Sequence, residues 1–282
     1  MGSSVLIAKI EIVHGLSVPS FFDSQASSTS SNVNDPLLIR PAESHEAWFD
    51  FRGRFEELKG QCGEDQRVKL LWIARHGEGY HNVGINKYGP ETWNGPLARV
   101  NGDGEIVWGP DPLLTPVGES QAKALNEAWK AAVASGMHTP ERWYCSPMRR
   151  TASTLELTFD SLLPPHIRPK FIENLREHHG VHTCDKRISR TELGSLFPNF
   201  EFPDPFSEED ILWDPDHRET EEELRTRLSK AIEEVILDGW DSTFISITSH
   251  SGAIRAMLKV IGHPPVQLQT GGVVPVILKI SK

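Results

Sequence analysis

Strand-like apolar runs alternate with helical segments from Val68 onward, and this alternation constrains the fold more than any other feature of the sequence. The first run, VKLLWIAR, is almost continuously apolar, which is typical of a strand buried on both faces within a parallel sheet. The strand-like runs lie at 68–75, 141–146, 168–173, 244–249 and 273–280. Their alternation with helices predicts an α/β fold in three layers, α/β/α, with a mostly parallel central sheet.

Amphipathic segments with apolar residues at helical spacing surround these strands. Thr115 suits a helix N-cap because its hydroxyl accepts a backbone N–H bond, and Pro116 fits the first helical position. The helical segments lie at 44–61, 115–135, 147–163, 219–237 and 252–262. The stretch 177–218 shows little periodicity and several prolines, so we expect a lid-like insertion of loops and short helices there.

The chain before residue 61 differs in composition from the rest. Residues 24–36 are rich in Ser and Asn and offer little to bury, which predicts a mobile loop. We therefore expect an N-terminal extension over 1–60 and a single domain over 61–282.

Charge and cysteine content limit the classes of partner. The 282 residues carry a net charge of −10, which repels nucleic acid and anionic membrane surfaces, so we expect neither as a partner. Three widely spaced cysteines argue against a disulfide framework and favour a reducing compartment. Because no apolar run approaches the ~18 residues of a membrane span, we expect a cytoplasmic protein; its oligomeric state stays open.

Cationic and imidazole side chains follow three of the predicted strands. Arg75 and His76 follow the first strand, His250 follows the strand at 244–249, and Arg149 and Arg150 lie in the first turn of the helix after 141–146. Ligand sites in such sheets lie at the carboxyl ends of the strands. An exposed helix N-terminus together with a guanidinium group suits a phosphate. Any one of these motifs can be incidental, but their coincidence at one edge indicates an anion site.

Four motifs in a fixed order resemble those of the histidine phosphatase superfamily, also called phosphoglycerate-mutase-like. They are LLWIARHGEGYHNVG, LLTPVGESQA, SPMRRTAST and SHSG, within residues 68–280. The segment LREHHGVHTCDKR at 175–187 looks most like the fungal and plant phosphomutase-like branch. The resemblance implies the phosphoglycerate-mutase-like fold and a phosphoric monoester hydrolase that uses no cofactor.

The resemblance also implies a role for each matching residue. A neutral His76 attacks phosphorus and becomes phosphohistidine, while Arg75, Arg150 and a protonated His250 hold the phosphoryl oxygens. The same cations should depress the pKa of His76. Asn82 is expected to donate a hydrogen bond to the phosphoryl group. Arg149 is an alternative to Arg150, which occupies the family position four residues after the serine of SPMRR.

The leaving oxygen needs a proton, which calls for a carboxyl group that is partly protonated. One branch of the superfamily carries an Asp directly after the second histidine, but here Ser251 stands there, and we assign it to substrate binding. Glu177 matches the acid position of the mutase-like branch; the alternative is an ordinary exposed loop carboxylate. Glu78 directly follows the RHG motif and is expected to orient the site.

Other interpretations stay open. His179, His182 and Cys184 have the residue types of a zinc site, but no CxxC lies nearby, and we expect no metal. The predicted lid includes Lys186 and Arg187. Trp93 and Trp108 either wall the pocket or pack in the core. Aromatic residues of the insertion could adapt the site to a bulky hydrophobic phosphate or diphosphate; they are Phe197, Phe200, Phe202, Phe206 and Trp213.

The leading functional prediction is a phosphatase that hydrolyses a small phosphorylated metabolite through phosphohistidine. Its close rival is a phosphomutase, which returns the phosphoryl group to another hydroxyl. A non-catalytic phosphate-binding module is a third possibility, since a fold alone does not fix a function.

Overall fold

The computed structural model describes residues 7, 9–19 and 44–282. The mobile loop predicted at 24–36 lies outside these residues. No helix among the residues so described is long and apolar enough to cross a membrane.

A six-stranded sheet forms the centre of the molecule, with the strand order β1-β6-β2-β5-β3-β4. The strands are β1 (Lys9–Ile12), β2 (Gln66–Arg75), β3 (Arg142–Cys145), β4 (Lys170–Phe171), β5 (Phe244–Ser249) and β6 (Val273–Ser281). The four strands β2, β5, β3 and β4 run parallel, whereas β6 is antiparallel to both β2 and β1. The predicted three-layer fold with a mostly parallel sheet is confirmed.

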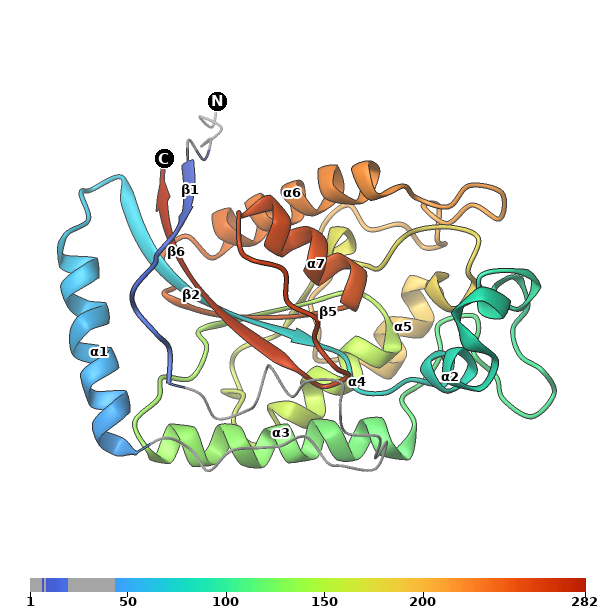
Figure 1. The fold of residues 1–282 in the computed structure, drawn as a ribbon, viewed down its shortest axis with the longest axis horizontal. Coiled ribbons are helices and arrows are strands. Elements are labelled where there is room, and N and C mark those ends of the chain that lie inside the picture. Colours follow the sequence, from blue (N-terminus) through green and yellow to red (C-terminus); the bar gives the residue numbers. More distant parts are fainter. Residues whose placement is uncertain (1–6, 8, 20–43) are drawn as a thin grey trace.

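Helices cover both faces of this sheet (Figure 1). They are α1 (His45–Gly60), α2 (Tyr80–Trp93), α3 (Pro116–Ala134), α4 (Arg149–Thr158), α5 (Arg190–Leu196), α6 (Glu221–Asp238) and α7 (Ser251–Val260). Short 3-10 turns lie at Pro96–Arg99, Glu173–Leu175 and Thr183–Asp185. In Figure 1, α6 and α7 lie above the sheet and α3 and α4 lie below it, while α2 lies beyond the carboxyl end of β2.

The near-continuous apolar character of β2 follows from its central place between two hydrophobic clusters. Trp72 packs edge-on against Trp129 of α3, with ring centroids 5.2 Å apart, in the cluster on one face. The next residue, Ile73, points to the other face and shares a cluster with Ile247 and Ile254. Burial of each such side chain contributes about 1.5–3 kcal/mol, so both faces of the strand hold it in place.

The chain before residue 61 contributes to the same sheet and core. β1 pairs with β6 at the sheet edge. Ser44 caps α1, because its hydroxyl accepts a hydrogen bond from Ala47 N at 3.3 Å, and Trp48 and Phe55 of α1 are buried in the first cluster. The division of the chain at residue 60 stays a prediction.

Three elements differ from the expectation. α2 was not predicted, because Gly89 with φ 76° and Pro90 interrupt its pattern. α4 begins at Arg149 rather than at 147, since Thr151 Oγ1 bonds the carbonyls of Ser146 and Met148 and closes a turn ahead of the helix. The strand predicted at 168–173 is reduced to the two residues of β4.

Candidate active site

The register of the parallel pair β2 and β5 sets the two histidines side by side. Arg75 at the end of β2 is the partner of Ser249 at the end of β5, and His76 N donates to Ser249 O at 3.1 Å. His76 and His250 are the next residues after these two strand ends, and the centroids of their rings lie 5.2 Å apart. The carboxyl edge of the sheet therefore brings together two imidazoles that are far apart in the sequence.

His76 is held as a neutral base with one free nitrogen. Its side chain is buried, and Nδ1 lies 2.6 Å from Gly77 O. A carbonyl oxygen only accepts, so Nδ1 carries the hydrogen and Nε2 keeps the lone pair. Burial, with the guanidinium groups of Arg150 and Arg75, holds the pKa of His76 well below its usual range. The direction is the expected one, although burial is the larger cause.

Two arginines reach this position from different strand ends. Arg150 is 1% exposed and donates to Cys184 O at 2.8 Å and to Asp185 Oδ1 at 3.0 Å. Arg75 donates to Leu268 O at 2.8 Å. Burial lowers the pKa of Arg75 to about 10, so it stays cationic at neutral pH.

Arg149, the alternative, turns away from this position. It donates to the carbonyls of Pro110 and Asp111.

His250 is fixed by a neighbouring hydroxyl. Its Nε2 lies 2.8 Å from Ser146 Oγ, and its buried Nδ1 has no hydrogen-bond partner in the described parts of the chain. Burial and the charge of Arg150 hold the pKa of His250 well below its usual range. In a site formed by the protein's groups alone, His250 is therefore neutral. The expected protonated form stays a prediction for a site that holds an anionic phosphoryl group, which would favour protonation.

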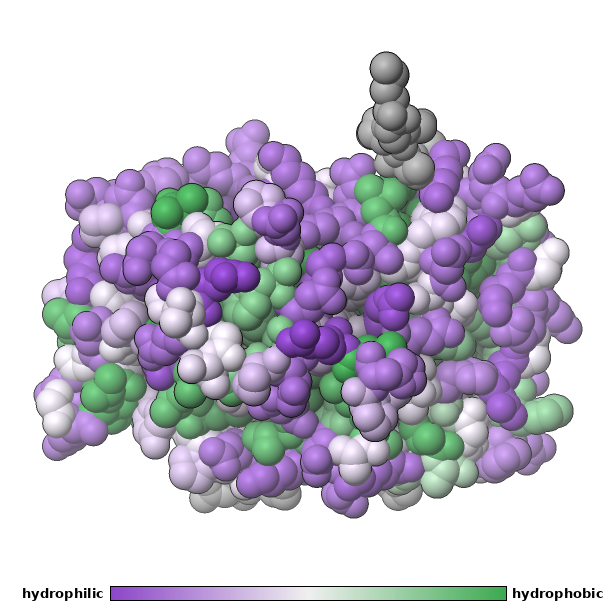
Figure 2. Space-filling view, turned by 180° about the vertical axis from the view of Figure 1, so that it is seen from behind, coloured by the Kyte–Doolittle hydropathy of each residue, from purple (hydrophilic) through white to green (hydrophobic). Residues whose placement is uncertain are grey.

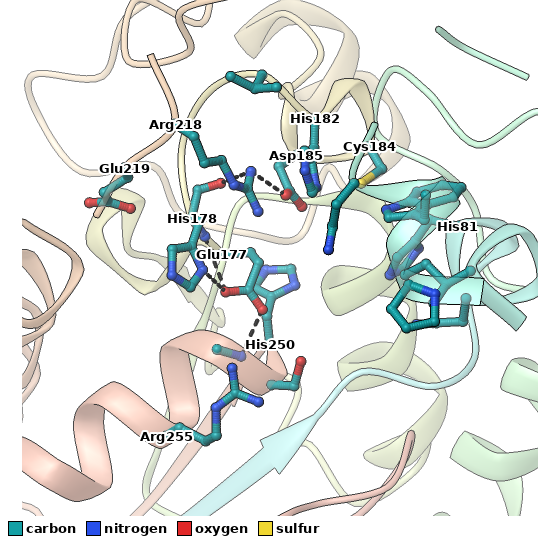
Figure 3. A pocket seen from close by; sticks show the side chains of 18 of the residues that line it. His81, Glu177, His178, His182, Cys184, Asp185, Arg218, Glu219, His250 and Arg255 are labelled. Carbon is teal, nitrogen blue, oxygen red and sulfur yellow. Dashed lines mark hydrogen bonds and ion pairs between the residues drawn. The ribbon is translucent and has the colours of Figure 1, made fainter. Parts of the chain in front are cut away.

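The side chain of Glu177 extends from the insertion into the same cavity (Figure 3). It is largely buried and accepts hydrogen bonds from two residues. Its Oε2 accepts from Gly252 N at 2.8 Å, and its Oε1 lies 2.9 Å from His178 Nδ1. Burial raises the pKa of Glu177, but the hydrogen bonds from His178 and Gly252 N outweigh it, and the pKa lies well below its usual range. These donors favour the ionised form of Glu177, and the expected partly protonated carboxyl stays a prediction.

These groups line one cavity of about 1030 Å³. Of the predicted site residues, the cavity is lined by Arg75, His76, Asn82, Arg150, Glu177, His250 and Ser251. Glu78 is not among the described residues that line it. Instead, its carboxylate accepts from Thr115 Oγ1 at 2.7 Å, and its backbone N donates to Gln121 Oε1 at 2.8 Å. Glu78 therefore ties the RHG loop to the start of α3.

The sequence matches the model of the histidine phosphatase superfamily (branch 1) over residues 71–273. The chain belongs to this superfamily. It is 39% identical over 237 residues to "Probable phosphoglycerate mutase" of Arthroderma benhamiae, covering 83% of this chain and 70% of that one. It is 32% identical over 273 residues to "Phosphomutase-like protein 3" of Candida albicans, covering 94% and 82%. A third relative, "Phosphoglycerate mutase-like protein 1" of Arabidopsis thaliana, is 30% identical over 239 residues, covering 73% and 77%.

A solved structure shares the fold. The ecdysone phosphate phosphatase of Bombix mori superposes with a TM-score of 0.51 at 19% identity, covering 73% of this chain and 88% of that one. The resemblance to the fungal and plant phosphomutase-like branch is confirmed by the relatives, and the chain is an enzyme of the histidine phosphatase superfamily.

The insertion of this histidine phosphatase contributes polar rather than aromatic residues to the cavity. None of Phe197, Phe200, Phe202, Phe206 and Trp213 is among the described residues that line it. Phe200, for example, stacks on Phe171 with centroids 4.7 Å apart. Lys186 lies over the Trp213 ring, and Arg187 is buried against backbone carbonyls. The proposed aromatic substrate wall is therefore wrong, because these rings pack into the protein.

Of the two tryptophans, Trp93 walls the pocket and Trp108 packs in the core. Trp93 lines the cavity, whereas Trp108 is fully buried and packs edge-on against Trp93, with centroids 5.2 Å apart. One therefore walls the site and the other supports that wall.

The residues that could hold a metal ion in the structure differ from those that the sequence suggested. His182, Cys184 and Asp185 bring donor atoms within 4.8 Å of one another, and His179 is not part of this group. Asp185 already accepts from Arg150 and Arg218. Burial raises the pKa of the Cys184 thiol well above its usual range, so it stays protonated. This donor set fits a divalent cation poorly.

Several residues of the site escape prediction from the sequence. His81 lines the cavity, and its ring centroid lies 5.3 Å from that of His76. The sequence feature that could have indicated His81 is its position five residues after His76. Asp111 accepts from Arg149 N at 3.0 Å and thereby caps the start of α4. It lies two residues before the LLTPVGESQA motif, and nothing in that stretch of sequence indicates the contact. His178 and Asp185 depend on the path of the insertion, which no periodicity reports.

Proposed function

We propose that this enzyme hydrolyses a small phosphate monoester through a phosphohistidine formed at His76. One observation carries the proposal: His76, with its free Nε2, lines the same cavity as three residues that have buried polar atoms without a partner. Within the described residues, Arg75 Nε, Arg150 Nε and His250 Nδ1 are buried and have no hydrogen-bond partner. Buried polar groups without partners are costly, and a phosphoryl group would supply the missing acceptors.

The chemistry follows from these positions. His76 Nε2 attacks phosphorus in line with the leaving oxygen, and the charges of Arg75 and Arg150 stabilise the equatorial oxygens. Because burial keeps His76 unprotonated, its lone pair is available at neutral pH. Water then attacks the phosphohistidine and releases inorganic phosphate. The positive charge comes from side chains of the chain itself, so we propose that the reaction uses no metal or cofactor.

Hydrolysis and mutase activity differ only in the acceptor of the phosphoryl group. The names of the fungal and plant relatives favour a mutase as the second candidate. The cavity of about 1030 Å³ favours hydrolysis, because it leaves room for water beside a small substrate. Incubation with 3-phosphoglycerate, with free phosphate and 2-phosphoglycerate both followed, separates the two. Isomer formation without phosphate release would overturn hydrolysis.

Loss of the nucleophile tests the mechanism. We expect His76→Asn to lower kcat for p-nitrophenyl phosphate by about 10³-fold or more, in the presence of a metal chelator. His166→Asn, at an exposed histidine, is the matched control and should keep wild-type activity. Wild-type activity in His76→Asn would exclude phosphohistidine, and an inactive wild type that still binds phosphate would favour a binding module.

A further inference from the structure

Glu177 presents a difficulty for proton transfer within the proposed function. It is the carboxyl group that the branch resemblance assigns to the leaving oxygen, yet its hydrogen-bond donors favour the ionised form. An ionised carboxylate has no proton to give. The proton must therefore be stored on a neighbouring group that contacts Glu177.

His178 is such a group, since each of its ring nitrogens faces a carboxylate. Nδ1 lies 2.9 Å from Glu177 Oε1, and Nε2 lies 3.2 Å from Glu221 Oε1 at the start of α6. Ionised carboxylates only accept, so both nitrogens must carry hydrogens for both bonds to form. The geometry thus favours the imidazolium form. The side chain of His178 is 14% exposed, whereas that of Glu221 is 74% exposed at the solvent end of the chain of contacts.

The charged groups around His178 agree with this geometry. Burial lowers the pKa of His178, but the bond to Glu177 outweighs it, and the net shift is upward. Glu221 from α6 adds to the rise, and Arg218, which donates to His178 O at 2.9 Å, opposes it. His182 of the insertion and His250 at the start of α7 lie nearby and have lowered pKa values, which leaves them neutral. Among these imidazoles, His178 is the one that the surroundings keep protonated.

We propose that His178 stores the proton that Glu177 delivers to the leaving group. This inference rests on the proposed function. Figure 3 shows the His178 ring directly beside the Glu177 carboxylate, on the side of the cavity that the insertion forms. His178 acts through Glu177 and is therefore a positioning and proton-storing residue.

The proton balance closes over one cycle. The bond between phosphorus and the leaving oxygen breaks while the bond from His76 Nε2 to phosphorus forms. In the same step the Glu177 carboxylate takes the proton from His178 Nδ1 and passes it to the leaving oxygen. When water attacks the phosphohistidine, its proton passes to Glu177 and back to His178 Nδ1, while His76 regains its lone pair. The net reaction consumes one water and needs no other co-reactant.

A purely structural role is the competing explanation. The Glu177 carboxylate bonds the N–H of Gly252 in the first turn of α7, so the His178 contact could serve only to hold this carboxylate against the helix. Such a role would affect all substrates alike. A stored proton affects only substrates whose leaving group needs it.

Two substrates distinguish these roles in the full chain. Nitrophenolate leaves as a stable anion without a proton, whereas the alkoxide of glycerol 2-phosphate requires one. We expect His178→Asn to lower kcat/KM for glycerol 2-phosphate by about 10²-fold or more, and for p-nitrophenyl phosphate by less than about 3-fold. Glu222→Gln, at the exposed neighbour of Glu221 on α6, is the control and should behave as wild type with both substrates.

An equal loss for both substrates, or no loss for either, would overturn the role of His178. His76→Asn in the same two assays tests the proposed function separately, because it should abolish both activities. If His76→Asn fails to do so, the proposed function is wrong. If His76→Asn abolishes both activities while His178→Asn changes kcat/KM equally for both substrates, only the inference about His178 fails.

Discussion

Arg150 depends on a carboxylate of the insertion for its place in the cavity. Asp185 Oδ1 accepts from Arg150 at 3.0 Å, and its Oδ2 accepts from Arg218 at 2.9 Å. Arg150 and Asp185 are both almost fully buried, with side-chain exposures of 1% and 5%. A buried pair of this kind is costly to break, because removing one partner leaves the other charge unpaired.

Asp185→Asn keeps the shape of the side chain and removes its charge. We expect the free energy of unfolding to fall by about 3 kcal/mol, because Arg150 loses the nearer of its two buried counter-charges and keeps only Asp111 at 4.0 Å. We also expect kcat/KM for p-nitrophenyl phosphate to fall at least about 10-fold, since the guanidinium is no longer held near His76. Urea unfolding and steady-state kinetics measure the two effects.

Glu209→Gln is the matched control for Asp185→Asn. Glu209 lies in the same insertion, its side chain is exposed, and it forms no ion pair with the described residues. Both measurements should stay at wild-type values in this variant. Full activity in Asp185→Asn at undiminished stability would show that Arg150 is held by other contacts.

Residues at strand ends could be predicted from the sequence, whereas those that support them could not. His76 and His250 each follow an apolar run directly, so the parallel sheet alone brings them to one edge. Asp185 reaches Arg150 only because a 3-10 turn at Thr183–Asp185 directs it there. No local pattern reports such a turn, because its position is decided by packing with distant residues.

At the scale of elements, the first turn of α3 packs backbone to backbone against the RHG loop. Thr115 N donates to Glu78 O at 2.8 Å, and the Thr115 hydroxyl caps the helix by accepting from Gly118 N at 3.1 Å. A Cβ on Gly118 would collide with the backbone of Glu78. The motif LLTPVGESQA therefore needs its glycine so that the helix can approach the nucleophile loop closely.

Gly118→Ala tests this approach. The added methyl must push the RHG loop away from α3, so we expect a loss of about 1–3 kcal/mol in the free energy of unfolding. A displacement of His76 by about 1 Å should lower kcat about 10²-fold. Thermal unfolding and kinetics with p-nitrophenyl phosphate measure both.

Gly53→Ala in α1 is the control for the same substitution within a helix. Apart from the backbone of α1 itself, no atom of the described residues lies within 4 Å of a Cβ built there, so we expect unchanged activity and a gain of about 0.5–1 kcal/mol from helix propensity. If Gly118→Ala behaved like Gly53→Ala, the close contact with Glu78 would have no role in placing His76.

Strands and long amphipathic helices were predictable as elements because their periodicity reflects the side on which they are buried. α6, for example, buries Leu224, Leu228 and Ile232 at helical spacing. α2 was missed because Gly89 and Pro90 break that spacing. The path of the insertion could not be predicted for a related reason: its apolar residues pack as scattered rings rather than along one face.

At the scale of the whole molecule, the apolar side chains visible on one face are dispersed among hydrophilic ones (Figure 2). Histidines with strongly lowered pKa values lie instead in the interior. Six histidines have folded-state pKa values below the usual one, with desolvation by burial as the largest cause: His76, His81, His138, His179, His182 and His250. Four carboxyl or imidazole groups have the opposite, upward shifts; they are His178, Glu156, Glu234 and Asp111, that of Asp111 to about 6. The fold thus holds more neutral imidazoles than an unfolded chain would below pH 6.5.

This imbalance predicts acid sensitivity. Below about pH 6.5 the unfolded chain binds a proton at each of the six histidines more readily than the folded chain does, so the free energy of unfolding falls as the pH falls. The four groups with raised pKa values work against this trend, because the folded protein holds their protons more tightly. Six groups exceed four, so we expect a net loss of several kcal/mol between pH 7 and pH 5, measured by urea unfolding at each pH.

His179→Gln isolates one of these groups. The pKa of His179 lies near 2, its Nε2 is buried without a partner among the described residues, and it is not among the described residues that line the cavity. Its removal should reduce the slope of unfolding free energy against pH by about 1.4 kcal/mol per pH unit between pH 6 and pH 5, while catalysis is kept. His166→Gln, at an exposed position, should leave the slope as it is in the wild type. An unchanged slope in His179→Gln would mean that the unfolded chain does not take up this proton, and the acid sensitivity would then have to arise from the carboxylates.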